Sequence, residues 1–418
     1  MRFSDLNKRL QENRIEKKEK KVVAKKTDSL DNFQKNIEKD KNLDIPEYAI
    51  NKIEKKDISN IEPILEKEEK TTKLESTDKN KDIRFSIKRN VETKKISFDE
   101  DVCFRRSENS YSLMISSMKN IIESIKDSSY IFAFKEINML SDMIINEVKE
   151  NRYILNFIKY LTPKNYIISH SLNLSIIVSG ISNYLGFDYE IIKKLVLSSL
   201  CIDFGMMNYS HMYLLERKFS KEDFEIIKSH IDEGVEIAKK VFAFEIELKE
   251  FVIDVIKNSH ERYDGSGYFG RKGDDIKQIH QIVAISDIYE ALTHKRAWRD
   301  AFEEPYAVSM IIKDYQNKFE RNVMKGFLRY ICIYPESSIV KLSTGEIGRV
   351  ILNNTDKPTR PIVKILMDEN FKEVEPYNID LFDFPLTYID GWVSLKELKI
   401  KNPDFYRKES LFRLWIEI

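Results

Sequence analysis

The chain has 418 residues, which is long enough for two or three domains, and its 69 basic and 69 acidic side chains give a net charge of zero. Because the charges balance, we do not expect a nucleic-acid partner. The N-terminus lacks the apolar core of a signal peptide, and no run approaches the ~18 uninterrupted apolar residues of a membrane span. We therefore expect a cytoplasmic protein with no membrane span.

Residues 1–108 are expected to form a charged, mostly disordered arm. Runs such as KKEKKVVAKK and EKEEKTTK dominate it, and it contains neither glycine nor tryptophan. Such a composition cannot bury enough apolar surface to offset the entropy lost on ordering. Lysine runs can attract nucleic acid or anionic lipid, but acidic residues alternate with them here, so a solvated arm is the favoured interpretation.

The three cysteines, Cys103, Cys201 and Cys332, are widely spaced and odd in number. This pattern fits neither a disulfide framework nor a zinc knuckle. A reducing cytoplasm is the natural setting for it.

Two further domains are expected after the arm. Residues 109–333 show helical periodicity and predict a mainly α-helical domain, whereas residues 334–418 are β-branched and rich in turns, which predicts a small β-rich module. In the module, SIVKLSTGEIGRVILNN predicts two strands joined at Thr344-Gly345, and RPIVKILMD predicts a third. Nothing in the module indicates chemistry; such units most often mediate packing or partner contact.

All six histidines fall between residues 170 and 294, inside the expected helical domain. Histidine is the commonest metal ligand and a proton carrier, so the clustering indicates a site. In NYIISHSLNLSIIVSGISNYLGF, apolar residues recur at spacings of three and four, and His170 falls in the same series. This pattern places His170 on the buried stripe of an amphipathic helix. That stripe consists of Ile167, His170, Leu174, Ile177, Ile181 and Tyr184.

The same spacing places three more ionisable residues on the inner faces of helices. In FEIIKSHIDEGVEIAKKVF a single helix would carry His230 inward, with Gly234 leaving room for something to approach one turn along. Asp287 lies on the inner stripe of IHQIVAISDIYEALT, and Asp203 on that of KKLVLSSLCIDF.

Each of these residues alone has an ordinary explanation, because a single histidine on an apolar stripe is more often a hydrogen-bonded core residue than a ligand. Asp203, within the apolar stretch LCIDFGMM, could be a surface turn residue, a paired carboxylate or a metal ligand. Four ionisable groups facing inward from four helices favour a shared divalent cation, which would satisfy all of them. We assign no role to His211, His280 or His294, and we expect His294 to be exposed.

The stretch NSHERYDGSGYFG, residues 258–270, resembles the signature of the HD-GYP family, bacterial metal-dependent phosphodiesterases that hydrolyse cyclic-di-GMP. The resemblance covers about residues 112–333 and implies an HD-type helical bundle. The β-rich module resembles an extension that some members carry after it.

The resemblance implies roles for individual residues. Asp203 would be the catalytic aspartate that bridges two metals, which activate a water for in-line attack on a phosphodiester. A divalent metal such as iron or manganese is the implied cofactor. The implied metal ligands are His170, Asp203, His230, His260 and Asp287, and the residues expected to bind substrate are Arg296, Arg299, Gly267 and Tyr268.

The sequence also departs from the family pattern. Ile202 stands where the family has the histidine of its His-Asp pair, Ser259 where it has the first of two adjacent histidines, and Met206 where a lysine contacts phosphate. Phe269 replaces proline after the Gly-Tyr pair, and Glu290 replaces an aspartate. Each metal would lose one protein ligand, so we expect one ion, two weakly held ions or none.

Two functional hypotheses follow from the retained and missing residues. In the first, the chain is a divergent cyclic-di-GMP phosphodiesterase with weakened or lost hydrolysis. In the second, it is a non-catalytic scaffold that binds cyclic-di-GMP or a protein partner, through the loop around Tyr268-Phe269, the N-terminal arm or the β-rich module. A purely structural role for the former site is a third interpretation that one sequence leaves open.

Overall fold

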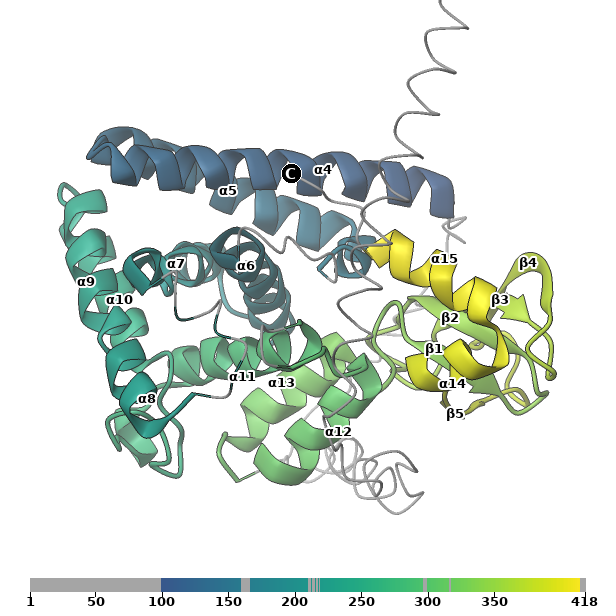
Figure 1. Cartoon of the computed structure of the whole chain (residues 1–418). Coiled ribbons are helices and arrows are strands. Elements are labelled where there is room, and N and C mark those ends of the chain that lie inside the picture. Colours follow the sequence, from purple (N-terminus) through teal and green to yellow (C-terminus); the bar gives the residue numbers. More distant parts are fainter. Residues whose placement is uncertain are drawn as a thin grey trace, which may run out of the picture. The chain divides into compact units, whose positions relative to one another are not determined.

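The computed structural model describes residues 99–158, 166–209, 212, 215, 217, 219–295, 299–315 and 317–413. The predicted disorder of the arm up to residue 98 lies outside these residues. Helices cover residues 100 to 331 and a small sheet follows (Figure 1). The helices of the first part are α4 (Glu100–Lys126), α5 (Tyr130–Glu150), η3 (Arg152–Asn156), α6 (Tyr166–Tyr184), α7 (Tyr189–Cys201), η4 (Phe204–Tyr209), α8 (Lys221–Lys228), α9 (His230–Val241), α10 (Ile246–Asn258), η5 (Gly273–Asp275), α11 (Gln278–Thr293), α12 (Glu304–Tyr315) and α13 (Arg321–Ile331).

Helix α4 begins before the predicted end of the arm at residue 108. Its side-chain cap explains the difference: Asp99 accepts a hydrogen bond from the Val102 backbone N–H, and Glu100 and Asp101 favour the positive end of the helix dipole. Helices α4 and α5 run side by side (Figure 1). The boundary at residue 108 therefore falls inside the first helix.

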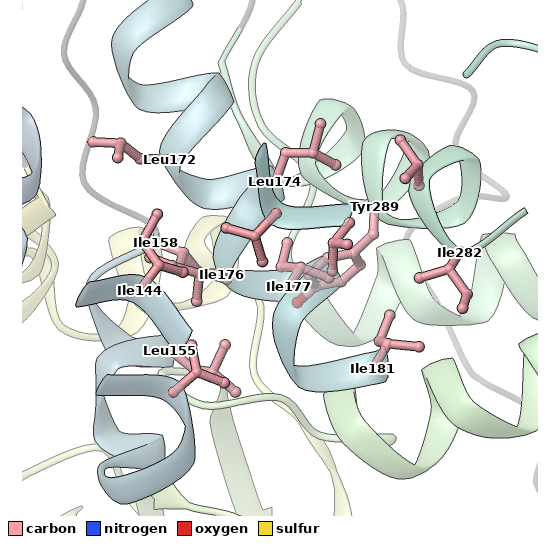
Figure 2. Close-up of a cluster of buried hydrophobic side chains, with 14 of the residues drawn as sticks. Ile144, Leu155, Ile158, Leu172, Leu174, Ile176, Ile177, Ile181, Ile282 and Tyr289 are labelled. Atoms are coloured by element: carbon pink, nitrogen blue, oxygen red, sulfur yellow. The ribbon is translucent and has the colours of Figure 1, made fainter. Parts of the chain in front are cut away.

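Helix α6 is the central helix of the bundle, in contact with α4, α5, α7, α11 and α13. It is buried on nearly every side, since Ser171, Asn173 and Ser175 are as inaccessible as the apolar residues of the predicted stripe. The prediction of an amphipathic helix was therefore wrong, and Tyr184 at its C-terminal end is partly exposed. Figure 2 shows Leu174, Ile177 and Ile181 of α6 beside Ile282 and Tyr289 of α11.

The segment expected to form one helix around His230 is two helices. Helix α8 ends at Lys228, Ser229 caps it, and α9 begins at His230. The close approach predicted at Gly234 is made instead by Gly205 of η4, where an added Cβ would lie 1.9 Å from the His230 carbonyl oxygen. Gly234 has only ordinary clearance, with its nearest contacts at 3.6 Å. Glycine at 205 thus lets the backbone after α7 lie against the start of α9.

The C-terminal part is a five-stranded antiparallel sheet in the order β4-β3-β2-β1-β5. The three predicted strands are present as β1 (Ile339–Leu342), β2 (Ile347–Leu352) and β3 (Ile362–Met367), with Gly345 at a φ of +98° in the first hairpin turn. The sequence analysis missed β4 (Glu373–Asp380), β5 (Ile389–Trp392), α14 (Leu395–Lys401) and α15 (Pro403–Arg413). Leu398 of α14 and Phe405 of α15 pack with Ile347 and Met367 of the sheet.

A buried ion pair joins the helices to the module. Arg152 Nε lies 2.6 Å from Glu336 Oε1; the Glu336 side chain is buried and that of Arg152 is nearly so. The guanidinium also lies 4.8 Å from the centre of the Tyr330 ring and donates to the Tyr330 carbonyl. Beside it, Asn156 donates to the carbonyl of Ile351 in β2.

The three cysteines are free thiols, with Cys201 and Cys332 buried. Among the described residues, no helix combines the length and the apolar character that crossing a membrane requires.

Gly205→Ala should lower the free energy of unfolding by at least about 1–3 kcal/mol, because the backbone of α9 must move to admit the new methyl group. Gly234→Ala is the matched control. Its Cβ has room and alanine favours the helix, so stability should hold or rise by up to about 1 kcal/mol. Urea denaturation measures both, and equal losses would contradict the close approach at Gly205.

Arg152→Ala should cost about 3–5 kcal/mol because it leaves the Glu336 carboxylate buried without its cation. Lys194→Ala removes an ion pair to Glu247, whose side chain is 88% exposed, and should cost less than about 1 kcal/mol. A loss for Arg152→Ala no larger than for this control would show that the junction does not depend on the pair.

Candidate metal site

Five ionisable residues meet in the helical bundle. His170 comes from α6, Asp203 from the turn between α7 and η4, His230 from the first position of α9, His260 from the loop after α10, and Asp287 from α11. His170, Asp203 and His230 are at most 5% exposed. Asp203 is therefore not a surface turn residue, nor does it lie within α7, which ends at Cys201.

His170 is oriented by the carboxylate of Glu290. Its Nδ1 lies 2.6 Å from Glu290 Oε2, so this nitrogen carries the proton and donates it. Its Nε2 is buried without a hydrogen bond, 3.4 Å from Asp203 Oδ2 and 3.5 Å from Asp287 Oδ1. A carboxylate behind a histidine is the usual second partner of a metal-binding imidazole.

His230 is held in the same tautomer by the backbone. Because α8 ends just before it, its Nδ1 can donate to the carbonyl of Ile227. That bond leaves the Nε2 lone pair 3.7 Å from Asp203 Oδ1, buried and without a hydrogen bond. The two oxygens of Asp203 thus face one histidine each.

His260 completes the group through Asp287. Its Nδ1 lies 3.4 Å from Asp287 Oδ2, and its Nε2 is buried without a partner. The ring stacks on Tyr268, with centroids 4.6 Å apart, and meets the His230 ring edge-on at 5.3 Å. Tyr268 therefore fixes the plane of the imidazole.

The spacing of these atoms fits a metal ion better than direct hydrogen bonding. Two ligands that each lie about 2.1 Å from a tetrahedral ion are about 3.4 Å apart, and the separations of the His170 and His230 Nε2 atoms from the carboxylate oxygens of Asp203 and Asp287 run from 3.4 to 3.7 Å. Ligand atoms of Asp203, His230 and His260 all lie within 4.8 Å of one another. Three buried imidazole nitrogens without hydrogen bonds need a partner, and a divalent cation would supply it.

The electrostatic field at the site is negative. Burial opposes a charge on His170, but the carboxylates of Glu290, Asp203 and Asp287 outweigh it and raise the pKa of this histidine to about 9. Burial also works against ionisation of Asp287, yet the neighbouring side chains of His260, His170 and Arg262 keep its pKa at about 2. For His230 burial dominates and lowers the pKa. Such a field attracts a cation.

The signature loop is folded onto Glu261, a residue to which the sequence analysis gave no role. Its buried carboxylate accepts from the backbone N–H groups of Phe269 and Arg271, both at 2.8 Å. At Gly267 an added Cβ would lie 2.5 Å from the Glu261 Cα, so only glycine fits there. This packing positions the Tyr268 ring against the imidazole of His260.

Three of the five departures from the family pattern, Ile202, Ser259 and Met206, have other partners. Ile202 is buried in the main apolar core. Ser259 donates from Oγ to the Ile256 carbonyl at 2.9 Å. Met206 packs with Ile167 and Ile227 in a small apolar cluster. None of the three offers a metal or phosphate a strong ligand.

Of the two arginines predicted to bind substrate, the structure describes only Arg299. Arg296 lies outside the described residues. The guanidinium of Arg299 donates to the carbonyls of Ala291 and Leu292 at the end of α11 and lies 4.5 Å from the centre of the Phe302 ring. Lys228, which the sequence analysis missed, has its Nζ 5.9 Å from the centre of the Tyr268 ring.

The prediction that His294 is exposed was wrong. Its side chain is buried, with Nδ1 2.8 Å from the Glu290 carbonyl oxygen and Nε2 2.6 Å from that of Ile158. Ile158 lies far away along the chain, so no local sequence pattern predicts this contact. His280 is also buried, 3.1 Å from Asp254 Oδ2, and His211 lies outside the described residues.

Two family models match the chain. Residues 143–323 match an HD domain, and residues 339–401 match a KOW domain associated with HD domain. The chain therefore carries an HD domain followed by a KOW-like module, which confirms the fold class and the resemblance noted in the sequence.

Curated relatives share this region. The chain is 21% identical over 244 residues to the cyclic di-GMP phosphodiesterase PA4108 of Pseudomonas aeruginosa, a match that covers 58% of each chain. It is 24% identical over 289 residues to the cyclic di-GMP phosphodiesterase PdeB of Borreliella burgdorferi, covering 68% of this chain and 73% of that protein. A solved structure of Bd1817, a HDG"Y"P protein from Bdellovibrio bacteriovorus, aligns at a TM-score of 0.44 and 18% identity over 56% of this chain and 73% of that one.

Glu290→Gln should weaken metal binding about 10- to 100-fold, because a neutral amide holds and polarises His170 less well than a carboxylate. Calorimetric titration of the full chain with Mn²⁺ measures the affinity. Glu147→Gln is the control, since this buried carboxylate pairs with Arg106 outside the site. It should lower stability and leave Mn²⁺ affinity unchanged, whereas equal effects of the two variants would contradict a local role for Glu290.

Proposed function

We propose that the chain is a divergent, metal-dependent cyclic-di-GMP phosphodiesterase of HD-GYP type, with hydrolysis that is weakened or lost. One observation carries the proposal: the Nε2 atoms of three histidines are buried without hydrogen bonds, and the three rings lie beside two buried carboxylates. The names of the relatives in Pseudomonas and Borreliella supply the substrate class.

The proposed metal ligands are the five residues predicted from the sequence, His170, Asp203, His230, His260 and Asp287. A divalent ion bound there would act as a Lewis acid that activates water and stabilises charge on a phosphodiester. Their distances support two overlapping sets that share Asp203, one with His170 and Asp287 and one with His230 and His260.

The surrounding residues would keep these ligands in position. Glu290 and the Ile227 carbonyl hold Nδ1 of His170 and of His230, so Nε2 of each ring faces the proposed ions, and an ion that binds His170 would displace the proton from its Nε2. Tyr166 donates to Asp203 Oδ2 at 3.3 Å, and its ring stacks on His170 with centroids 5.1 Å apart. Such preorganisation lowers the cost of binding an ion.

Substrate binding is proposed for Arg296, Arg299, Gly267 and Tyr268. The partly exposed ring of Tyr268, which stacks on His260, and the nearby ammonium of Lys228 support binding of an anionic nucleotide, because a base can stack on an aromatic ring and a phosphate can pair with the cation. Lys228 is also bonded to Glu225 at 2.7 Å, so it would have to exchange that partner for a phosphate.

Weakened catalysis is proposed from the missing ligands. Ile202 and Ser259 leave each proposed ion with three protein ligands, and Met206 removes one cation from the phosphate clamp. A catalyst needs charge stabilisation and metal activation at the same time, so these losses compound. The burial of Ile202 in the apolar core favours the second candidate, a non-catalytic domain that binds cyclic-di-GMP.

The deciding experiment measures hydrolysis and binding of cyclic-di-GMP by the full chain with added Mn²⁺ or Fe²⁺. We expect turnover at least about 100-fold below that of a relative with all ligands, measured in parallel, and its complete loss in Asp203→Asn. Binding without turnover would support the second candidate. Absence of both binding and turnover, in protein shown to be folded by circular dichroism, would exclude both candidates.

Restoring the missing ligands provides the converse test. Ile202→His combined with Ser259→His should raise Mn²⁺ affinity and hydrolysis if the two positions face the ions as the family pattern implies. Ile202→Leu with Ser259→Ala is the matched control and should raise neither. Unchanged metal content in the stably folded double-histidine variant would contradict the proposed ligand positions.

A further inference from the structure

A group of exposed apolar side chains occurs in the module, away from the residues of the metal site in the chain. Five large apolar residues between 377 and 388 are exposed by 48 to 92%, the highest being Leu386. A concentration of exposed large apolar side chains in one short segment is characteristic of an interaction surface. These residues are Tyr377 of strand β4 and Phe382, Phe384, Leu386 and Tyr388 of the loop that follows it, and together they are called the aromatic loop.

Hydrogen bonds from Arg360 and Ser343 hold the backbone of the aromatic loop. Arg360 donates from its guanidinium to the carbonyls of Phe384, Pro385 and Thr387. Tyr388 and Ser343 exchange two hydrogen bonds, one from the backbone of each residue. Because the backbone is fixed while the side chains face solvent, the loop is a preformed surface, which lowers the entropy lost on binding.

The segment that carries the loop is acidic. Residues 373–390 contain five acidic side chains and neither lysine nor arginine, and Lys372 directly precedes them. Lys408 pairs with Glu373 at 2.9 Å, and Arg360 binds three carbonyl groups of the loop, so the acidic groups exceed these three basic ones. The acidic residues are Glu373, Glu375, Asp380, Asp383 and Asp390.

We propose that the aromatic loop is a docking surface for a lysine- or arginine-rich protein segment that also carries aliphatic side chains. The aliphatic groups would pack on Phe384 and Leu386, and the basic groups would pair with Asp383 and its acidic neighbours. An apolar centre with a charged rim is the ordinary arrangement of a specific interface.

The acidic residues around the aromatic loop argue against a nucleic acid or an anionic membrane as its partner, and the sequence of β4 argues against a second copy of the chain. A nucleic acid or an anionic membrane would be repelled by the five carboxylates, although aromatic rings can stack on bases. A second copy of the chain pairing through strand β4 is disfavoured by Pro376, which cannot donate a backbone hydrogen bond, and by like charges at Glu373 and Glu375.

The test uses the full chain and a fluorescent 14-residue peptide in which pairs of lysine alternate with Leu-Val pairs. Anisotropy should give a dissociation constant of about 1–100 μM at low salt, with affinity falling as salt rises. A peptide with glutamate in place of every lysine should bind at least tenfold more weakly. Equal binding of the two peptides, or binding of neither, would overturn the proposal.

The variants separate the loop from the rest of the surface. Phe384→Ser combined with Leu386→Ser, and separately Asp383→Lys, should each weaken peptide binding at least tenfold while circular dichroism and Mn²⁺ affinity stay unchanged. Phe132→Ser with Phe244→Ser is the control, because these residues of the helical domain are 65% and 82% exposed. Equal weakening by this control would show non-specific adsorption and overturn the assignment.

Two further measurements cover the alternative occupants. Tighter binding of an unstructured RNA oligonucleotide than of the lysine peptide, lost in Phe384→Ser with Leu386→Ser, would replace the proposal with a nucleic-acid surface. A concentration-dependent dimer in sedimentation experiments that the same variant dissociates would replace it with self-association. A monomer with no measurable RNA affinity, together with peptide binding, supports the proposal.

Discussion

The site depends on one constraint, which is that the buried carboxylate of Asp203 must face a histidine on each side. Oδ2 faces His170 on α6, and Oδ1 faces His230 on α9. This geometry requires the chain after α7 to lie against the first turn of α9, and Gly205 is the residue that makes the contact possible. The break between α8 and α9 serves the same end, because it frees the Ile227 carbonyl to hold His230.

The residues that orient the proposed metal ligands are present, whereas two of the ligands that the family pattern implies are missing. Glu290, Tyr166 and Tyr268 each orient a ligand, and Glu261 folds the signature loop onto them. Ile202 and Ser259, in contrast, are satisfied by the apolar core and by a neighbouring carbonyl. Position and orientation are thus retained where coordination is reduced, which is a state suited to weak ion binding.

The sequence predicted burial better than contacts. Spacings of three and four predicted inner positions for His170, His230 and Asp287, and all three are buried, although α6 is buried on nearly every side and His230 begins a separate helix. The grouping of the five residues came from the family resemblance. Glu290 holds His170, and His294 is turned inward by the carbonyl of Ile158. In each pair the two residues are more than a hundred positions apart along the chain, and no local sequence pattern predicts such contacts.

Helix α4 enters the fold at the module. Glu100, its first residue, pairs with Lys364 of β3 at 3.0 Å and lies 3.4 Å from the Tyr153 hydroxyl, one residue beyond Arg152 of the ion pair with Glu336. The same helix contacts η3 and the central helix α6, which carries His170. One helix therefore ties the first described residues of the chain both to the sheet of the module and to the helix that positions a proposed metal ligand.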